Sequence, residues 1–188
     1  MQSPFVEVPV LPVVVPLGLM VFVLLAWRLK VKQNLSFPRV LVAAAVGIYA
    51  AGIVGNTIFP IILNAPPRTE AWDSGIVYVP FADYELMDAL TNMLVFVPLG
   101  ILFALVLSQP AWWKVMLAVI ASSLGIEATQ LLVQDLFGGG HIADSSDLVS
   151  NVAGGALGYL LLRILMLVPG LAGFIDRFRW AAPAAAEH

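Results

Sequence analysis

Charged residues are scarce in this sequence, and cysteine is absent. Only 11% of the 188 residues are charged, whereas 61% are hydrophobic, and the mean hydropathy is +0.95. Soluble domains carry roughly a quarter charged residues. The composition therefore excludes an ordinary soluble protein and predicts an all-α, polytopic membrane bundle. Without cysteine, disulfides and thiolate metal sites are also excluded.

Five apolar stretches are long enough to cross a bilayer, because about twenty helical residues match a hydrocarbon core of about 30 Å. The first contains several prolines, which weaken helix propensity, and lacks the basic start of a signal peptide, so we interpret it as a retained helix. We expect one transmembrane domain over residues 1–180 and a disordered, Ala-rich tail over 181–188. The stretches are 10–27, 40–63, 89–108, 112–133 and 148–168.

Positive charge lies almost entirely on one side of this topology. Eight of the nine lysines and arginines fall in the first loop, beside the turn before the fourth span, or near the end of the last span. Arg68 alone falls on the other side. Basic residues are retained on the cytoplasmic side, so the N-terminus is predicted outside and the C-terminus inside. Aromatic residues and arginines in 174–180 predict a short amphipathic helix on the inner leaflet.

A few polar residues interrupt the apolar spans. Glu127 lies within the fourth span, where a carboxylate is costly and is by default a candidate functional residue. In the predicted topology, Asn92 in the third span and Asn151 in the last reach a similar depth below the outer surface. We therefore predict one polar pocket open to the outer face. Its other candidate members are Asp88, Gln130, Asp147, Gln134 and Asn56.

The same residues also have a structural interpretation. Amide side chains in membrane helices often only bond across helices, for about 0.6 kcal/mol. Asp147, after two serines, would be a natural N-cap for the last helix. Gly154 and Gly158 form a GxxxG pair on the flank of Asn151. A neighbouring helix can approach closely there, which would press Asn151 into the interior.

Three segments in order, 92–100, 127–130 and 144–155, resemble the VanZ-like family. They match its N-x3-F-x-P-x-G, E-x2-Q and D-x2-D-x3-N-x2-G patterns at the ends of successive spans, and the resemblance covers about residues 88–162. The matched residues are Asn92, Phe96, Pro98, Gly100, Glu127, Gln130, Asp144, Asp147, Asn151 and Gly154. The resemblance implies a small multi-pass protein of the bacterial cytoplasmic membrane, associated with reduced susceptibility to the glycopeptide teicoplanin.

The chain departs from the family at one position. The family commonly has an arginine just upstream of the aspartates, where this chain has His141. If that arginine pairs with Glu127 or grips an anionic headgroup, His141 does so only when protonated. Its unperturbed pKa of about 6.5 would leave it mostly neutral at pH 7.

Four functions remain open. In the first, the outer pocket binds a membrane lipid, a lipid-linked cell-wall precursor or the glycopeptide antibiotic itself. In the second, the protein is an enzyme that modifies a lipid headgroup, with Glu127 as general acid or base and His141 or Asp147 as partner. In the third it is a transporter or proton relay, although the inner half of each span lacks matching polar residues. In the fourth the polar side chains only hold the bundle together.

We favour the binding function. The sequence contains no HExxH, CxxC, nucleophile elbow or phosphate-binding motif that would support the enzyme. Carboxylates and amides could hold Mg²⁺ or Ca²⁺ through oxygen ligands, but the pattern predicts no metal site and identifies no cofactor. A nucleic-acid partner is not expected.

Overall fold

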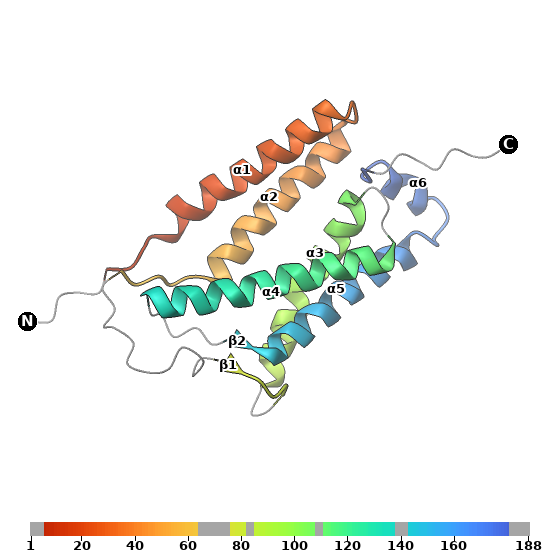
Figure 1. Ribbon diagram of the computed structural model, residues 1–188. Helices are drawn as coiled ribbons and strands as arrows, with labels where there is room; N and C mark the ends of the chain where they lie inside the picture. The colour runs from red at the N-terminus through yellow and green to blue at the C-terminus, as the bar shows by residue number, and fades with distance from the viewer. Residues whose placement is uncertain (1–5, 64–75, 82–84, 108–110, 138–142, 181–188) are drawn as a thin grey trace, which may run out of the picture.

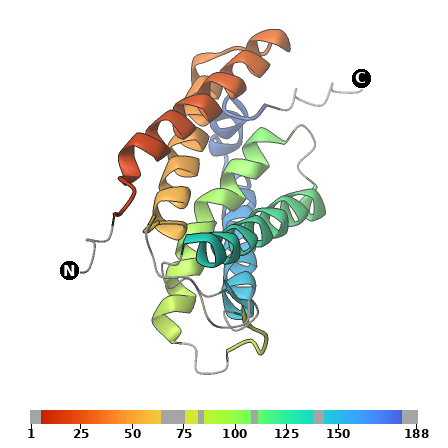
Figure 2. The same ribbon diagram turned by 60° about the vertical axis from the view of Figure 1, so that its left-hand side comes forward.

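The computed structural model describes residues 6–63, 76–81, 85–107, 111–137 and 143–180. Over these residues the chain forms six helices and two short strands (Figures 1 and 2). Five of the helices, α1 to α5, are long and apolar enough to cross a membrane, which confirms the predicted helical, multi-pass class. The elements are α1 (Val10–Val31), α2 (Phe37–Thr57), β1 (Ile76–Val77), α3 (Leu86–Val106), α4 (Trp112–Phe137), β2 (Ala143–Asp144), α5 (Ser145–Leu165) and α6 (Leu171–Asp176).

The first helix continues through its prolines. Pro9 occupies the N-cap position of α1 and Pro16 lies inside the helix, which continues to Val31 rather than ending near residue 27. A spanning helix tolerates proline when neighbouring groups satisfy the freed carbonyl. Arg28 and Lys30 lie in its last turn, where positive charge complements the C-terminal end of the helix dipole.

The last spanning helix begins earlier than expected. α5 starts at Ser145, and the Asp144 side chain accepts a hydrogen bond from the Ser146 backbone N–H at 2.7 Å. The prediction that Asp147 is the N-cap is therefore wrong. Asp144 has an extended backbone, as a cap requires, whereas Asp147 lies within the first helical turn.

The bundle has two ends of different character. At the site end, α2 and α4 finish, α3 and α5 begin, and β1 pairs with β2. At the basic end lie the α1–α2 turn, the start of α4 and α6 (Figure 1). The eight basic residues among the described segments all belong to the basic end: Arg28, Lys30, Lys32, Arg39, Lys114, Arg163, Arg177 and Arg179.

Glycines allow α3 and α5 to pack in parallel with their backbones in contact. A Cβ on Gly154 would lie 2.1 Å from the Met93 carbonyl oxygen, and one on Gly158 would lie 2.0 Å from that of Val97. No side chain fits at such distances. Asn151, one turn before Gly155, is only 4% exposed. The close approach predicted from the GxxxG pair, with Asn151 in the interior, is confirmed.

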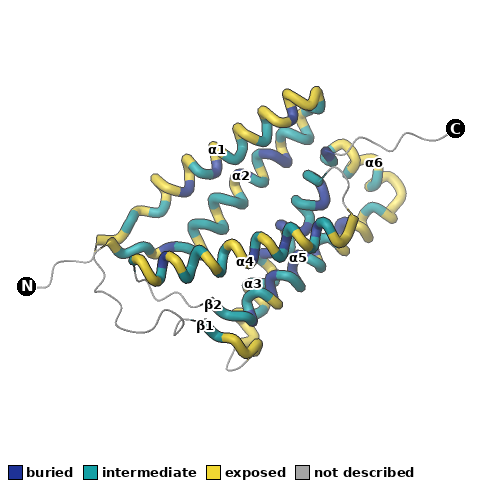
Figure 3. Tube along the Cα trace, in the orientation of Figure 1, coloured by how far each residue is buried: buried dark blue, intermediate teal, exposed yellow. Residues whose placement is uncertain are grey.

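Helices α1 and α2 form a hairpin beside the α3–α5 group (Figure 1). The two helices meet at glycines, since a Cβ on Gly18 would lie 2.8 Å from the Gly47 carbonyl oxygen. Buried residues line the inner faces of the bundle, and the outward faces are largely exposed (Figure 3). Large apolar residues such as Leu19, Ile48 and Leu94 project there, as expected for surfaces covered by lipid.

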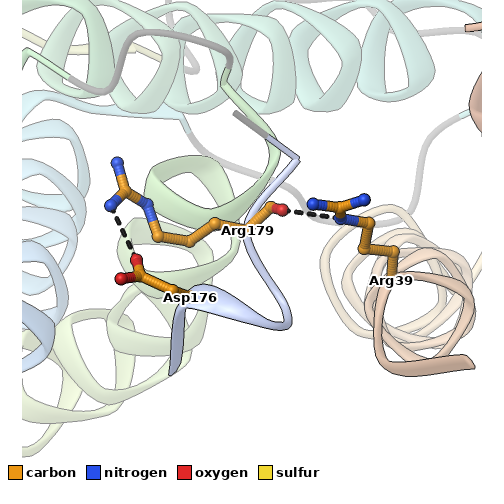
Figure 4. A network of polar contacts seen from close by, with 3 residues as sticks. All are labelled: Arg39, Asp176 and Arg179. Carbon is orange, nitrogen blue, oxygen red and sulfur yellow. Dashed lines mark hydrogen bonds and ion pairs between the residues drawn. The ribbon is translucent and has the colours of Figure 1, made fainter. Parts of the chain in front are cut away.

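Residues 177–180 turn back into the basic end. Trp180 is 7% exposed. Its backbone N–H donates to the Leu105 carbonyl at 2.8 Å, and its backbone carbonyl accepts from Asn34 Nδ2 at 2.8 Å. Figure 4 shows Arg39 Nε donating to the Arg179 carbonyl at 2.8 Å, while the Arg179 guanidinium pairs with Asp176 at 2.9 Å. The predicted amphipathic helix over 174–180 is thus partly wrong: α6 ends at Asp176 and Trp180 enters the core.

Candidate functional site

The start of α5 is held in place by a short parallel pairing. Ile76 of β1 pairs with Ala143 and Val77 with Asp144 of β2. The Phe81 backbone N–H then donates to the Ser146 hydroxyl at 2.9 Å, and Ser146 is fully buried. These bonds fix the backbone of β2 and the first turn of α5 against the end of α4.

Three carboxylates converge at this point. The Asp144 backbone N–H donates to Glu127 Oε2 at 3.2 Å, and Asp147 lies in the first turn of α5, which begins directly after Asp144. The group, called here the carboxylate cluster, thus draws Glu127 from α4, Asp144 from β2 and Asp147 from α5. At the site end the described residues include no lysine, arginine or histidine.

Helix α3 reaches the cluster through Asn92. Its Nδ2 donates to Asp147 Oδ1, a charge-assisted bond that ties the first turns of α3 and α5 together. Their similar depth below the predicted outer surface places Asn92 and Asp147 in one predicted pocket. The structure brings the two side chains into direct contact.

A second polar pair lies one turn deeper. Asn151 Nδ2 donates to Ser123 Oγ at 2.9 Å, and both residues are buried. Ser123 precedes Glu127 by four residues and Asn151 follows Asp147 by four, so in antiparallel α4 and α5 this pair forms the floor of the cluster. Asn151 Oδ1 is buried without a hydrogen-bond partner among the described residues.

Ser123 was not among the predicted site residues. The sequence offers one indication that Ser123 belongs to the site: it lies four residues before Glu127, on the same face of the helix. A serine in a membrane helix is so often bonded to its own backbone that this spacing alone does not single it out. Only the position of α5 shows that Ser123 meets Asn151.

One other predicted member makes its recorded contact away from the cluster. Gln130 bonds α2 instead, with Nε2 donating to the Thr57 carbonyl at 2.8 Å, and its Oε1 is buried without a partner among the described residues. Asp88 and Asn56 are exposed, and Gln134 is half-buried. His141 lies outside the described residues.

Oxygen ligands for a metal ion are not grouped in the part of the chain that the structure describes. No set of three or more acidic, histidine or cysteine side chains there could hold a metal ion together.

The model of the VanZ/LLP1 family matches residues 46–166 of this chain. The match confirms the resemblance inferred from the three segments and extends it beyond residues 88–162 to include the second half of α2. All members of the carboxylate cluster and its floor lie inside the matched region. No curated protein and no solved structure matches the chain.

Proposed function

Since the chain belongs to the VanZ/LLP1 family and is a multi-pass membrane protein, we propose that it modulates cell-envelope or glycopeptide susceptibility in a bacterial cytoplasmic membrane. It does so by binding the headgroup of a lipid, or of a lipid-linked cell-wall precursor, at the carboxylate cluster. The observation that carries this proposal is the hydrogen-bonded grouping of Glu127 with Asp144, and of Asn92 with Asp147, at one end of the spanning helices.

The charge distribution supports an outward-facing site. The eight described basic residues lie at the basic end, and the carboxylate cluster lies at the opposite end. By the positive-inside rule the basic end faces the cytoplasm. The cluster would then open at the outer leaflet, where wall precursors and glycopeptides are encountered.

Apolar packing on the far side of the Ser123–Asn151 floor favours binding over transport. One turn below the Ser123–Asn151 pair, a Cβ on Gly155 would lie 2.6 Å from the Val119 side chain. Val115, Val119 and Phe96 continue this apolar packing toward the basic end. A transporter needs a polar path across the bilayer, and tight apolar packing between the described parts of α3, α4 and α5 closes that route.

The test compares teicoplanin susceptibility of a susceptible bacterium with and without the protein. We expect the native chain to lower susceptibility and Glu127→Gln to abolish the effect at equal membrane abundance. Asp135→Asn is the matched control, because it removes an exposed carboxylate at the same end of α4, and it should retain the effect. Equal protection by Glu127→Gln would contradict a role for the cluster.

A biochemical measurement separates binding from catalysis. Purified protein incubated with labelled lipids, with and without divalent cations, should leave the lipids unchanged if the function is binding. Lipid turnover that is lost in Glu127→Gln would instead assign Glu127 as the general acid or base of a headgroup-modifying enzyme.

A further inference from the structure

We infer that the basic end of the bundle binds an anionic phospholipid, whose phosphate group is held by Arg39. This site lies at the opposite end of the molecule from the carboxylate cluster, and it does not depend on the proposed function. The inference is drawn from the excess of positive charge at the basic end, from the hydrogen bonds of Arg39, and from the apolar surface beside that residue.

Positive charge at the basic end exceeds the negative charge there. Eight basic residues of the described segments lie at this end, whereas Asp176 is the only acidic residue described there, and it pairs with Arg179. The helix ends change this balance little. Helices α1, α3 and α5 finish here and α2 and α4 begin here, and each end carries only about half an elementary charge. The described part of the basic end therefore has a net positive charge, which an anion would complement.

Arg39 is held by three acceptors that carry no charge. Its Nε donates to the Arg179 carbonyl at 2.8 Å, and its Nη1 donates to both the backbone carbonyl and Oδ1 of Asn34. Figure 4 shows the Arg179 guanidinium on the other side, where it contacts Asp176. These bonds fix the Arg39 guanidinium without neutralising it. Arg39 is half-buried, and a positive charge removed from water is costly without a counter-ion.

The Arg39 guanidinium also has donors to spare. An arginine side chain has five N–H groups, and the three recorded bonds of Arg39 use only Nε and Nη1. Nη2 makes no recorded bond with the residues that the structure describes. Charge-assisted bonds from arginine to phosphate oxygens are among the strong hydrogen bonds of proteins. Arg39 thus supplies both the charge and the donors that a phosphate group requires.

The position of Arg39 favours a phospholipid over a free anion. Arg39 lies in the first turn of α2, a helix long enough to span the membrane, so it lies near the level of the lipid headgroups. The segments on either side of its bonds expose large apolar side chains, Leu35 and Phe37 on one and Leu167 and Phe174 on the other. Acyl chains would cover this surface, whereas a free phosphate would leave it in contact with water.

Native mass spectrometry of the purified full-length protein measures the preference. Glycerol and choline phospholipids with identical acyl chains compete at equal concentration; the choline group neutralises its own phosphate, whereas the glycerol lipid keeps a net negative charge. We expect the glycerol lipid to be retained about tenfold more, which is the factor that one hydrogen bond to a charged group contributes. A second series adds inorganic phosphate, which should not displace the lipid.

Three variants, each of which lowers the charge of the basic end by one, test the assignment to Arg39. Arg39→Gln removes the guanidinium and should abolish the preference. Ser36→Asp places a carboxylate three residues before Arg39, at the N-cap of α2, where aspartate is a favoured residue, and it should also reduce the preference. Arg163→Gln is the matched control, because it removes an exposed basic residue in the last turn of α5, and it should retain the preference.

The possible outcomes either support or overturn the inference. Thermal unfolding shows whether Arg39→Gln is folded; if it is not, Ser36→Asp, which leaves the Arg39 side chain intact, takes its place in the comparison. Equal retention of the two lipids by the native protein overturns the inference. An equal loss of preference in Arg163→Gln assigns the preference to diffuse surface charge and overturns the role of Arg39. Displacement of the lipid by inorganic phosphate overturns the assignment of a lipid and leaves a site for a soluble anion.

Discussion

At the scale of single residues, the cost of placing carboxylates near the bilayer is met by backbone groups. Glu127 accepts the Asp144 N–H, and Asp144 in turn accepts the Ser146 N–H as the cap of α5. Buried charges are tolerated when they are hydrogen-bonded or paired. Asp144 therefore has two roles: its backbone N–H bonds Glu127 in the carboxylate cluster, and its side chain caps the start of α5.

This dual role gives a prediction for Asp144. Asp144→Ala removes the cap and should lower the free energy of unfolding by about 0.5–2 kcal/mol, whereas Asp144→Asn keeps a capping oxygen and should cost much less. Thermal or denaturant unfolding in detergent measures the difference. Asp135→Asn is the control, since it removes an exposed carboxylate inside α4 that caps no helix start. Equal destabilisation by Asp144→Ala and Asp144→Asn would show that charge, not capping, is what matters at this position.

At the scale of elements, glycine contacts determine how closely the helices approach. Without a hydrophobic driving force between helices in lipid, close packing and interhelical hydrogen bonds stabilise the bundle. The α3–α5 contact through Gly154 and Gly158 fixes the depth of Asn92 relative to Asp147. The geometry of the cluster thus depends on residues that carry no chemistry of their own.

Two glycines test this dependence. Gly158→Ala places a Cβ 2.0 Å from the Val97 carbonyl oxygen, so α3 and α5 must separate, and we expect lower thermal stability and weaker headgroup binding. Gly125→Ala is the matched control, because nothing lies within 4 Å of its Cβ position in α4. It should be neutral or stabilising by up to about 1 kcal/mol, since alanine favours the helix. A similar loss in both variants would point to helix propensity rather than to the α3–α5 contact.

Hydrogen bonds also attach the α1–α2 hairpin to the rest of the bundle at three levels. Gln130 bonds Thr57 at the site end, the Tyr49 hydroxyl bonds the Val95 carbonyl at 2.6 Å in the middle, and Arg39 bonds Arg179 at the basic end. Residues 34, 39 and 171–180 lie outside the region matched by the family model. The attachment at the basic end therefore lies outside the matched region.

At the scale of the whole molecule, the separation of charge along the bundle axis predicts its orientation. Because the chain has no cysteine, single cysteines can be introduced and labelled in intact cells with a thiol reagent that cannot cross the membrane. We expect Asp135→Cys at the site end to be labelled from outside, and Lys32→Cys at the basic end to be labelled only after permeabilisation. The reverse pattern would place the carboxylate cluster in the cytoplasm and contradict an outward-facing site.

Much of this architecture could be predicted from the sequence. The five apolar stretches correspond to α1–α5, although their predicted ends differ from the observed ones by up to six residues, as at the end of α2. The bilayer imposes both length and apolarity, so hydropathy locates spans well. Helix ends depend instead on capping residues. The predicted N-cap of α5 is Asp147 and the observed one is Asp144, because two nearby aspartates cannot be told apart as caps without their backbone angles.

The sequence by itself determined the class of the protein, its family and the approximate depth of its polar residues, because these follow from composition, period and motif order along one chain. Only the tertiary structure decided which polar residues meet. Asn92 joins Asp147 and Ser123 joins Asn151, whereas Gln130 turns away to Thr57. The physical reason is that contacts between helices depend on how the helices rotate and cross. The GxxxG pair predicts that a helix packs closely at Gly154 and Gly158, but it does not say which helix or which polar residues then meet.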